Sequence, residues 1–314
     1  MTIKECAEFL RLRDDYLILT HRKPDGDTLG SAAALALGLR SVGKRAVILE
    51  NPEITPRYAA LFGGLGIFGA SDGGGKTIVA VDTASPKLFP DNAKKLGAIA
   101  ALAIDHHPSN TRYAENLCLD SNAAACGELV FAVLNELGAD VGAETATAIY
   151  IAVATDTGCF SYGNTTADSF RIASETARLG ADVAELNRVL FRAKSKSKIA
   201  LEGYIYSNIV YSHGGRAAVL TIPAEILART AEDDLENIAA IPASAEGVII
   251  GITLRELADE IRVSVRTAPG CDANVFSGRF GGGGHAQAAG FSIKQPLADA
   301  QSRIAEAVDG LFGK

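Results

Sequence analysis

The sequence of 314 residues contains no tryptophan, and aromatic residues make up only 6% of it. Its five cysteines are scattered, odd in number and free of any Cys-x-x-Cys pair. This pattern argues against a disulfide framework and against a cysteine zinc site, and it indicates a reducing compartment. Without tryptophan, any stacking on nucleotide bases falls to Phe and Tyr side chains.

Long hydrophobic runs are also missing. Uncharged stretches such as 97–104 and 145–155 are far shorter than the ~20 apolar residues that a membrane-spanning helix needs. The first residues carry Lys4 and Glu5, where a secretory signal would have an apolar segment. These features predict a soluble cytoplasmic protein that has no membrane partner.

Basic charge is in short supply. The chain has 30 Lys and Arg against 37 Asp and Glu, a net charge of −7, and a pI of about 5.3. Proteins that bind long nucleic acids usually present a basic surface, so long duplexes are not expected as partners. With 48% hydrophobic and 21% charged residues, the chain is typical of a globular protein, and its length favours two domains.

The first half alternates strand-like and helix-like segments. Short apolar runs predict strands, longer periodic runs predict helices, and this alternation is typical of parallel sheets with helices on both faces. The sequence therefore predicts an α/β fold. The expected strands are 16–20, 45–49, 78–81 and 101–104, and the expected helices are 29–42, 124–137, 143–155 and 167–178.

The pattern changes after the segment 188–198, which carries five basic residues and no acid. Beyond it we expect antiparallel strands, with a hairpin around Gly214-Gly215, and a last helix over 297–311. The predicted domains are an α/β domain over residues 1–190, a linker over 191–200 and a smaller α+β domain over 201–314. The expected strands of this second domain are 208–211, 217–222, 248–255 and 260–267.

Acidic and histidine residues gather in four short segments of the first domain, three of them at the ends of predicted parallel strands. That edge of an open α/β sheet is where ligands bind. Individually these residues fit helix caps, turns or satisfied loop histidines. Together, carboxylates so close would repel one another unless a cation intervened. With the imidazoles they form an oxygen–nitrogen ligand set, which predicts a divalent-metal site. The residues are His21, Asp25, Asp27, Asp82, Asp105, His106, His107 and Asp156.

These segments resemble the four motifs of the DHH phosphoesterase superfamily. They read HRKPDGDTLGS from residue 21, VDT from 81, DHH from 105 and TDTGCF from 155. The sequence GGGGHAQAAG from residue 281 resembles the glycine–histidine signature of the DHH-associated C-terminal domain. The resemblance covers essentially the whole chain, and the two-domain length is similar to the stand-alone oligoribonuclease and pAp-phosphatase branch.

The resemblance implies a site for two divalent ions, with manganese as the preferred metal. One ion would be held by His21, Asp25 and Asp82, and the second by four ligands in which Asp82 is shared: Asp27, Asp82, His106 and Asp156. Two such ions can lower the pKa of a shared water. Asp105 is predicted to orient a histidine, and His107 is predicted to face the scissile phosphate.

The second domain is predicted to bind the substrate's phosphates. Gly282, Gly283, Gly284 and His285 form a stretch where backbone N–H groups can approach an anion, and we expect a helix to start directly after it. A flexible loop before a packed helix is the alternative. Arg262 and Arg266 share one face of a predicted strand, and Arg266 is the favoured ligand of the two. The alternative for this face is a solvated surface balanced by acidic neighbours.

The predicted activity is that of a manganese-dependent phosphoric ester hydrolase of the oligoribonuclease or phosphatase type. It would degrade short oligoribonucleotides to mononucleotides and also act on adenosine 3′,5′-bisphosphate (pAp). Hydrolysis of cyclic or linear dinucleotides is the nearest alternative, because the same motifs would serve it. A family II pyrophosphatase and a nucleotide sensor with an incomplete metal site are less favoured. The sequence leaves the direction of RNA degradation open, and assembly as a homodimer is one option.

Overall fold

The computed structural model describes residues 1–70, 73–235 and 238–313. The chain divides into two compact units, an N-terminal unit (Met1–Ala193) and a C-terminal unit (Lys194–Lys314), whose boundary lies inside the segment predicted as a linker. Residues 196–200 of that segment form the start of helix α9 (Lys196–Asn208). No helix in the described part of the chain is long and apolar enough to cross a membrane.

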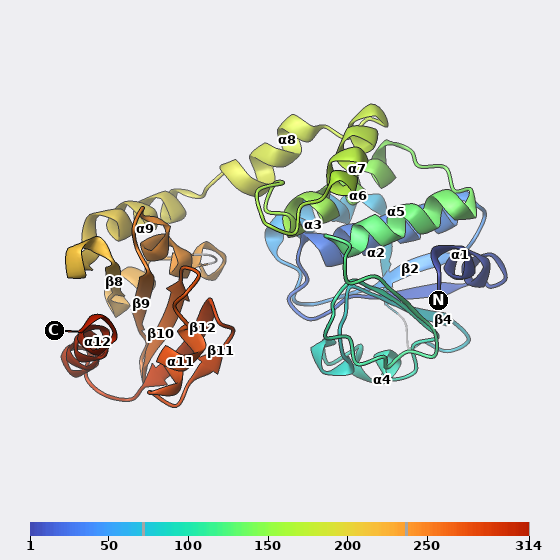
Figure 1. Cartoon of the computed structure of the whole chain (residues 1–314). Coiled ribbons are helices and arrows are strands. Elements are labelled where there is room, and N and C mark those ends of the chain that lie inside the picture. Colours follow the sequence, from blue (N-terminus) through green and yellow to red (C-terminus); the bar gives the residue numbers. More distant parts are fainter. Residues whose placement is uncertain (71–72, 236–237, 314) are drawn as a thin grey trace. The chain divides into compact units, whose positions relative to one another are not determined.

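The N-terminal unit, which Figure 1 colours from blue to yellow-green, is built on a six-stranded parallel sheet. The strand order is β3-β2-β1-β4-β5-β6. This confirms the predicted α/β fold. Its strands are β1 (Tyr16–Leu19), β2 (Ala46–Leu49), β3 (Phe68–Gly69), β4 (Thr77–Val81), β5 (Leu102–Asp105) and β6 (Leu117–Leu119). Its helices are α1 (Ile3–Arg11), α2 (Gly26–Ser41), α3 (Pro56–Phe62), α4 (Lys94–Gly97), α5 (Cys126–Leu137), α6 (Ala143–Asp156), α7 (Ala167–Arg178) and α8 (Val183–Asn187), followed by a π-helical turn (Arg188–Arg192).

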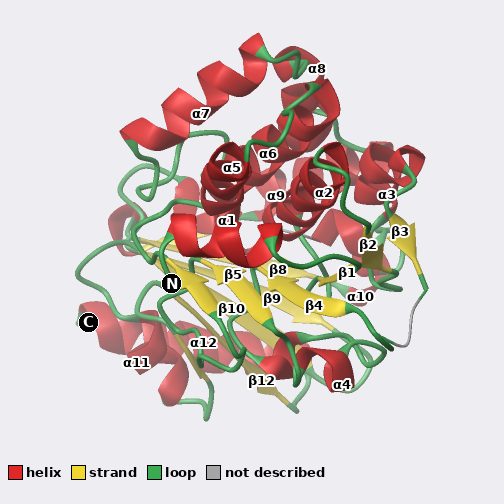
Figure 2. Ribbon diagram, turned by 90° about the vertical axis from the view of Figure 1, so that its right-hand side faces the viewer, coloured by secondary structure: helices red, strands yellow, loops and turns green. Residues whose placement is uncertain are grey.

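The two faces of this sheet are covered unequally. Helices α1, α2, α5 and α6 bury the main core on one face, and the short α4 and its flanking loops cover the other (Figure 2). Helices α2 and α6 are composed largely of Ala, Gly and apolar residues and are buried nearly all round. A helix without a polar face needs protein on every side, so α2 and α6 are central to the unit.

Close packing between α2 and α6 depends on Gly30. A Cβ atom at this position would overlap the carbonyl oxygen of Ala148 and lie 2.9 Å from the backbone nitrogen of Ala152. Since a backbone cannot yield like a flexible side chain, we expect Gly30→Ala to lower the free energy of unfolding by about 1–3 kcal/mol. Urea denaturation measures this. The control is Gly64→Ala, where the added Cβ meets open space and the expected change is within about 0.5 kcal/mol. Equal effects of the two substitutions would contradict this packing argument.

The C-terminal unit contains a second six-stranded sheet of order β11-β12-β10-β9-β8-β7. Its strands are β7 (Val210–Ser212), β8 (Ala217–Ile222), β9 (Ile250–Glu256), β10 (Ile261–Thr267), β11 (Gly283–Gly284) and β12 (Ala288–Ile293). Its helices besides α9 are α10 (Ala224–Leu227), α11 (Ala273–Gly278) and α12 (Leu297–Phe312). Helices α11 and α12 pack on one face of this sheet, and α9 packs on the other.

Two expectations for the C-terminal unit are wrong. The sheet is not wholly antiparallel, because β8 and β9 pair in parallel, joined by a crossover that contains α10 and short 3₁₀ turns. The glycines at 281–284 do not precede a helix either. They lead into a hairpin of β11 and β12, with Gly283 opposite Gly290. The predicted hairpin around Gly214-Gly215 is present, since β7 and β8 are antiparallel.

Candidate metal centre

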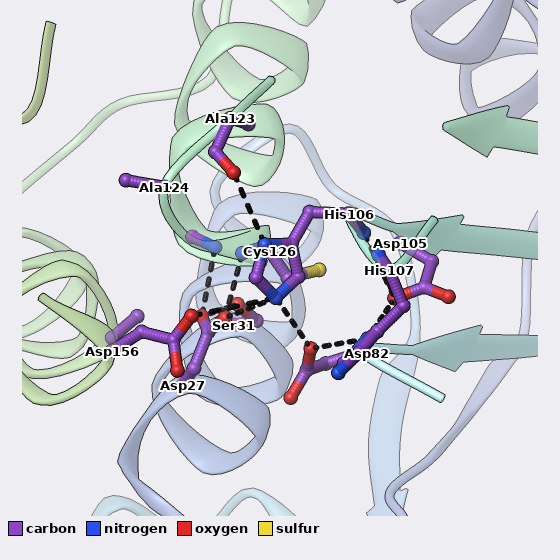
Figure 3. Close-up of polar contacts among 12 residues, drawn as sticks. Asp27, Ser31, Asp82, Asp105, His106, His107, Ala123, Ala124, Cys126 and Asp156 are labelled. Carbon is purple, nitrogen blue, oxygen red and sulfur yellow. Dashed lines mark hydrogen bonds and ion pairs between the residues drawn. The ribbon is translucent and has the colours of Figure 1, made fainter. Parts of the chain in front are cut away.

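The carboxyl ends of three neighbouring strands bring the predicted acidic and histidine residues together. His21 follows β1, Asp82 follows β4, and Asp105 ends β5 directly before His106 and His107. Asp25 and Asp27 lie at the start of α2 and Asp156 at the end of α6. We call the following residues the acid–histidine cluster (Figure 3 labels five of them): His21, Asp25, Asp27, Asp82, His106, His107 and Asp156.

The first ligand group of the cluster surrounds the imidazole of His21. Its Nε2 lies 3.7 Å from Asp82 Oδ2 and 3.9 Å from Asp25 Oδ1. Its Nδ1 is 2.7 Å from the carbonyl oxygen of Arg22, so Nδ1 carries the proton and Nε2 keeps a lone pair. Ligand atoms of His21, Asp25 and Asp82 all lie within 4.8 Å of one another, which is close enough for one ion to bind all three.

The second group surrounds His106. Its Nε2 lies 3.5 Å from Asp82 Oδ1, 3.5 Å from Asp156 Oδ2 and 3.7 Å from Asp27 Oδ2 (Figure 3). Its Nδ1 is 3.1 Å from the carbonyl oxygen of Ala123, which again leaves Nε2 free to bind a cation. Because Asp82 contacts both histidines through different oxygens, its carboxylate lies between the two groups.

Asp82 provides the test of whether a cation fits. The residue is 3% exposed and adopts a left-handed φ of 51°, which is uncommon for a non-glycine residue. Oδ2 accepts a hydrogen bond from Thr28 Oγ1 at 2.6 Å, whereas Oδ1 is buried without any hydrogen-bond partner among the described residues. A buried carboxylate oxygen with no donor is costly in free energy, and a cation at this point would satisfy it.

Asp27 is held in place by backbone and side-chain donors. Oδ2 accepts from Cys126 N–H at 2.6 Å, and Oδ1 accepts from Gly127 N–H at 2.9 Å and from Ser31 Oγ at 3.0 Å. The two N–H groups belong to the first turn of α5, where the helix dipole favours a negative charge. These contacts fix the orientation of a carboxylate that is 1% exposed.

The electrostatics of the cluster also favour a cation. Burial, with the nearby Asp82 and Asp156 charges, raises the pKa of Asp27 well above its ordinary value. Burial raises the pKa of Asp156 to about 6. Carboxylates that resist ionisation in the protein alone become fully ionised next to a divalent ion. The donor set of oxygen and nitrogen atoms, without sulfur, suits manganese, magnesium or a similar ion.

Asp105 and His107 form a hydrogen-bonded pair beside the cluster. The fully buried carboxylate of Asp105 accepts from His107 Nδ1 at 2.8 Å and from Asn110 Nδ2 at 2.5 Å. This hydrogen bond is the main cause that raises the pKa of His107 to about 9. Because Nδ1 donates to Asp105, the imidazole is fixed with Nε2 as its free nitrogen. His107 Nδ1 also lies 3.6 Å from Asp82 Oδ1, so ligand atoms of Asp82, His106 and His107 form a third close group.

These pKa shifts predict that the metal-free protein loses stability as the pH rises. The folded-state pKa of Asp156, about 6, exceeds its ordinary value of 3.8. The contribution of Asp156 to the free energy of unfolding therefore falls as the pH rises from 3.8 to 6. The stabilising charge of His107 is complete below pH 6.5 and is lost as the pH rises to about 9. Each effect is on the order of 1 kcal/mol, because both side chains are partly exposed and screened.

Urea denaturation in a chelator at pH 5, 7 and 9 measures this dependence. Asp156→Asn is the matched variant and should show a shallower decline between pH 5 and 7 than the unmodified protein. Adding a divalent ion should reverse the trend below pH 6, because ion binding requires ionised carboxylates. An identical decline in Asp156→Asn would contradict the assignment to this residue.

Several residues of the site were not predicted from the sequence. Thr28, Ser31 and Asn110 each donate to a cluster carboxylate or to Asp105. Asn164 donates through Nδ2 to the carbonyl oxygens of Ala124 and Asp156, both at 3.1 Å. Thr28 and Ser31 lie within the first motif, so their position next to Asp25 and Asp27 was a usable signal. Asn164 had none, because its contact with Ala124 joins segments 40 residues apart.

The predicted arginines of the C-terminal unit lie on the more exposed face of β10, where Arg262, Ser264 and Arg266 alternate with buried residues. The guanidinium of Arg262 pairs with Glu260 at 3.1 Å. Within the described residues Arg266 has no acidic partner, and its Nη1 donates only to the carbonyl oxygen of Val265. Arg266 therefore carries the less neutralised charge of the two.

Gly282 and Gly284 of the C-terminal unit have packing roles. A Cβ atom at Gly282 would overlap Gly290 O, and one at Gly284, whose φ is 155°, would overlap Ala288 O. The N–H groups of Gly282 and Gly284 already donate to Ser277 O and Asn274 Oδ1. These two N–H groups are therefore not available to an anion. Because no helix starts after the glycines, a helix dipole does not favour an anion there either. His285 is exposed, directly after the glycines.

Comparison with known families identifies the family to which the chain belongs. Residues 15–153 match the DHH family, N-terminal domain, and residues 214–314 match the DHHA1 domain. The chain belongs to the DHH family and is a phosphoric ester hydrolase of that family. The resemblance seen in the sequence motifs is thereby confirmed.

The chain is similar over nearly its full length to two curated relatives. It is 31% identical to the bifunctional oligoribonuclease and PAP phosphatase NrnA of Thermus thermophilus, over 96% of this chain and 92% of that protein. It is 27% identical to the protein of the same name from Bacillus subtilis, over 92% of each. The structure of an exopolyphosphatase-related protein from Bacteroides fragilis has the same fold, with a TM-score of 0.85 and 24% identity over 99% of this chain and 96% of that one.

Proposed function

We propose that the protein is a manganese-dependent hydrolase that degrades short oligoribonucleotides to mononucleotides and removes the 3′-phosphate from pAp. The observation that carries the proposal is the buried carboxylate of Asp82. It lies between the ligand groups of His21 and His106, and its Oδ1 has no hydrogen-bond partner among the described residues. The names of the two relatives support the substrate class.

In this proposal the acid–histidine cluster binds two divalent ions. His21, Asp25 and Asp82 would hold one ion, and a second set that shares Asp82 would hold the other: Asp27, Asp82, His106 and Asp156. When bound, such ions neutralise the phosphate and activate the attacking water. The protein's own contribution is to fix these side chains, through the α5 N–H groups on Asp27 and the carbonyl oxygens that orient both imidazoles.

His107 is proposed as the group that contacts the scissile phosphate. Its side chain is 41% exposed, and its Nδ1 is held by the buried Asp105, so Nε2 is free for a ligand. In the metal-free protein the hydrogen bond to Asp105 raises the pKa of His107 to about 9, which favours the protonated imidazole. A protonated imidazole can neutralise a phosphate oxygen and donate a proton to the leaving oxygen. Asp105 would act as the positioning residue for His107.

The C-terminal unit is proposed to bind phosphates of the substrate. Arg266 supports this role best, because its guanidinium lacks an acidic partner within the described residues. Arg262, already paired with Glu260, would contribute less. The exposed His285 is a further proposed contact, and the glycines Gly282, Gly283 and Gly284 would hold the loop that carries it. Arginine charges at this point would compensate for the net negative charge of the chain.

A substrate panel tests the proposal. RNAs of a few nucleotides, pAp, a cyclic dinucleotide and pyrophosphate are incubated with the protein in the presence of manganese, of magnesium or of a chelator. We expect manganese-dependent release of mononucleotides from the short RNAs and of AMP from pAp. Cleavage of the cyclic dinucleotide far faster than of linear substrates would overturn the proposal in favour of a cyclic-dinucleotide phosphodiesterase.

A further inference from the structure

The chain turns sharply straight after the cluster residue Asp156. Gly158, Cys159 and Phe160 all adopt left-handed backbone angles, with φ values of 55°, 55° and 63°. Two of the three carry side chains, for which this region is costly, and consecutive left-handed residues are rare. Such strain persists only where the surrounding structure enforces it, and it concentrates at functional sites.

Hydrogen bonds tie this turn to the acid–histidine cluster. The N–H groups of Ser161 and Tyr162 donate to the carbonyl oxygen of Thr157, at 2.9 and 3.0 Å. Asn164 closes the turn by donating to the carbonyl oxygen of Asp156, whose carboxylate belongs to the cluster. Residues 157–164 therefore form a hydrogen-bonded turn that adjoins the proposed metal centre.

The turn places the ring of Tyr162 against Gly158. A Cβ atom at Gly158 would fall inside van der Waals distance of three ring carbons of Tyr162, at nearly equal separations. Equal separations to Cε1, Cζ and Cε2 mean that the ring covers Gly158 with its face. Two features require glycine at this position. Its φ is in the left-handed region, and the Tyr162 ring occupies the space that a Cβ atom would need. Tyr162 thus lies beside a residue only two positions from Asp156.

The other features of Tyr162 are those of a binding surface. The residue is 61% exposed, and its hydroxyl forms no hydrogen bond with the described residues. A large aromatic side chain fixed on one face and open to solvent on the other is suited to stacking on a planar group. The neighbouring ring of Phe160 is occupied, since it stacks on Phe170 with centroids 5.4 Å apart.

We propose that Tyr162 is the platform on which a base of the substrate stacks while the adjoining phosphate lies at the acid–histidine cluster. This inference rests on the proposed function. It concerns the base, which is the part of the substrate that the acid–histidine cluster does not recognise. Every base has a π face, so stacking selects nucleotides over base-free phosphate esters without selecting a sequence. An enzyme that degrades short RNAs of any sequence needs that kind of selectivity.

The test compares substrates that differ only in their bases. Steady-state kinetics are measured with a diadenylate and with a dinucleotide of the same backbone in which hydrogen replaces both bases. We expect Tyr162→Ala to lower the ratio of the two kcat/KM values by about 10-fold, mainly through a higher KM for the diadenylate. Tyr162→Phe should keep the ratio within about 2-fold, because the ring is retained. Tyr206→Ala, which removes a tyrosine that is 64% exposed in the other unit, is the matched control.

A binding measurement gives an independent readout. By calorimetry, Tyr162→Ala should weaken the binding of AMP about 10-fold relative to that of ribose 5-phosphate. An unchanged ratio in both experiments, or an equal loss on base-containing and base-free ligands, would overturn the stacking role. These outcomes differ from a failure of the proposed function, in which the unmodified protein itself would not cleave the diadenylate.

Discussion

Asp82→Ala should abolish divalent-ion-dependent hydrolysis, with a fall in kcat of about 1,000-fold or more. The carboxylate lies between both ligand groups, and one of its oxygens has no hydrogen-bond partner among the described residues. Removing it takes a ligand from both proposed ions at once, and a loss of about 4 kcal/mol of transition-state stabilisation corresponds to that factor. Hydrolysis of a short RNA in the presence of manganese measures the effect.

The second readout for Asp82→Ala is thermal unfolding. Manganese should raise the melting temperature of the unmodified protein, because an ion that binds only the folded state stabilises it, and this increase should disappear in the variant. The control is Asp91→Ala, which removes an acid whose side chain is 94% exposed and paired with Lys94. Manganese-dependent turnover retained in Asp82→Ala would contradict the proposed centre.

His107→Ala should lower kcat by about 100- to 10,000-fold while leaving ion binding intact. In the proposal the imidazole contacts the phosphate through Nε2, and general acid catalysis contributes rate factors of this size. The matched variant is His106→Ala, which removes an imidazole from the centre of three carboxylates. That variant should lose both the activity and the increase in melting temperature caused by manganese.

The same pair of variants decides between two roles for His107. Its Nδ1 lies 3.6 Å from Asp82 Oδ1 and 2.8 Å from Asp105 Oδ1. If His107→Ala lost the manganese-induced stabilisation to the same extent as His106→Ala, His107 would be a metal ligand and its role at the phosphate would be rejected.

The arrangement of the cluster was predictable from the sequence because the rules that produce it are local. Apolar runs mark the buried strands, and polar residues directly after them must meet at one edge of a parallel sheet. His21, Asp82 and His106 follow such strands. Asp156 was harder to place, since it ends a helix, and only the motif pattern linked it to the others.

The features that were missed depend on tertiary contacts. The Asn164 side chain joins Ala124 to Asp156, and no local pattern predicts a contact over 40 residues. Strand β12 was missed because its first three residues, Ala288, Ala289 and Gly290, are small and none is β-branched as is typical of strands. The parallel pairing of β8 and β9 was missed because it depends on a crossover connection between them. Short strand-like runs in a sequence favour the prediction of hairpins, in which the two strands are antiparallel.

The acidic composition now has a physical interpretation. Part of the net charge of −7 lies in the acid–histidine cluster, where bound cations would reverse the local sign. In the C-terminal unit the guanidinium of Arg266 has no acidic partner among the described residues, so its positive charge is available to an anion. A short anionic substrate, as proposed here, needs positive charge at few points, whereas the many phosphates of long nucleic acids need an extended basic surface.

The most direct test of the proposed centre is anomalous X-ray diffraction at the manganese absorption edge from crystals grown with manganese. The proposal predicts two anomalous peaks about 3.5–4 Å apart. One should lie among His21, Asp25 and Asp82, and the other among Asp27, Asp82, His106 and Asp156, with Asp82 bound to both. A single peak, or peaks that do not share Asp82 as a ligand, would contradict it.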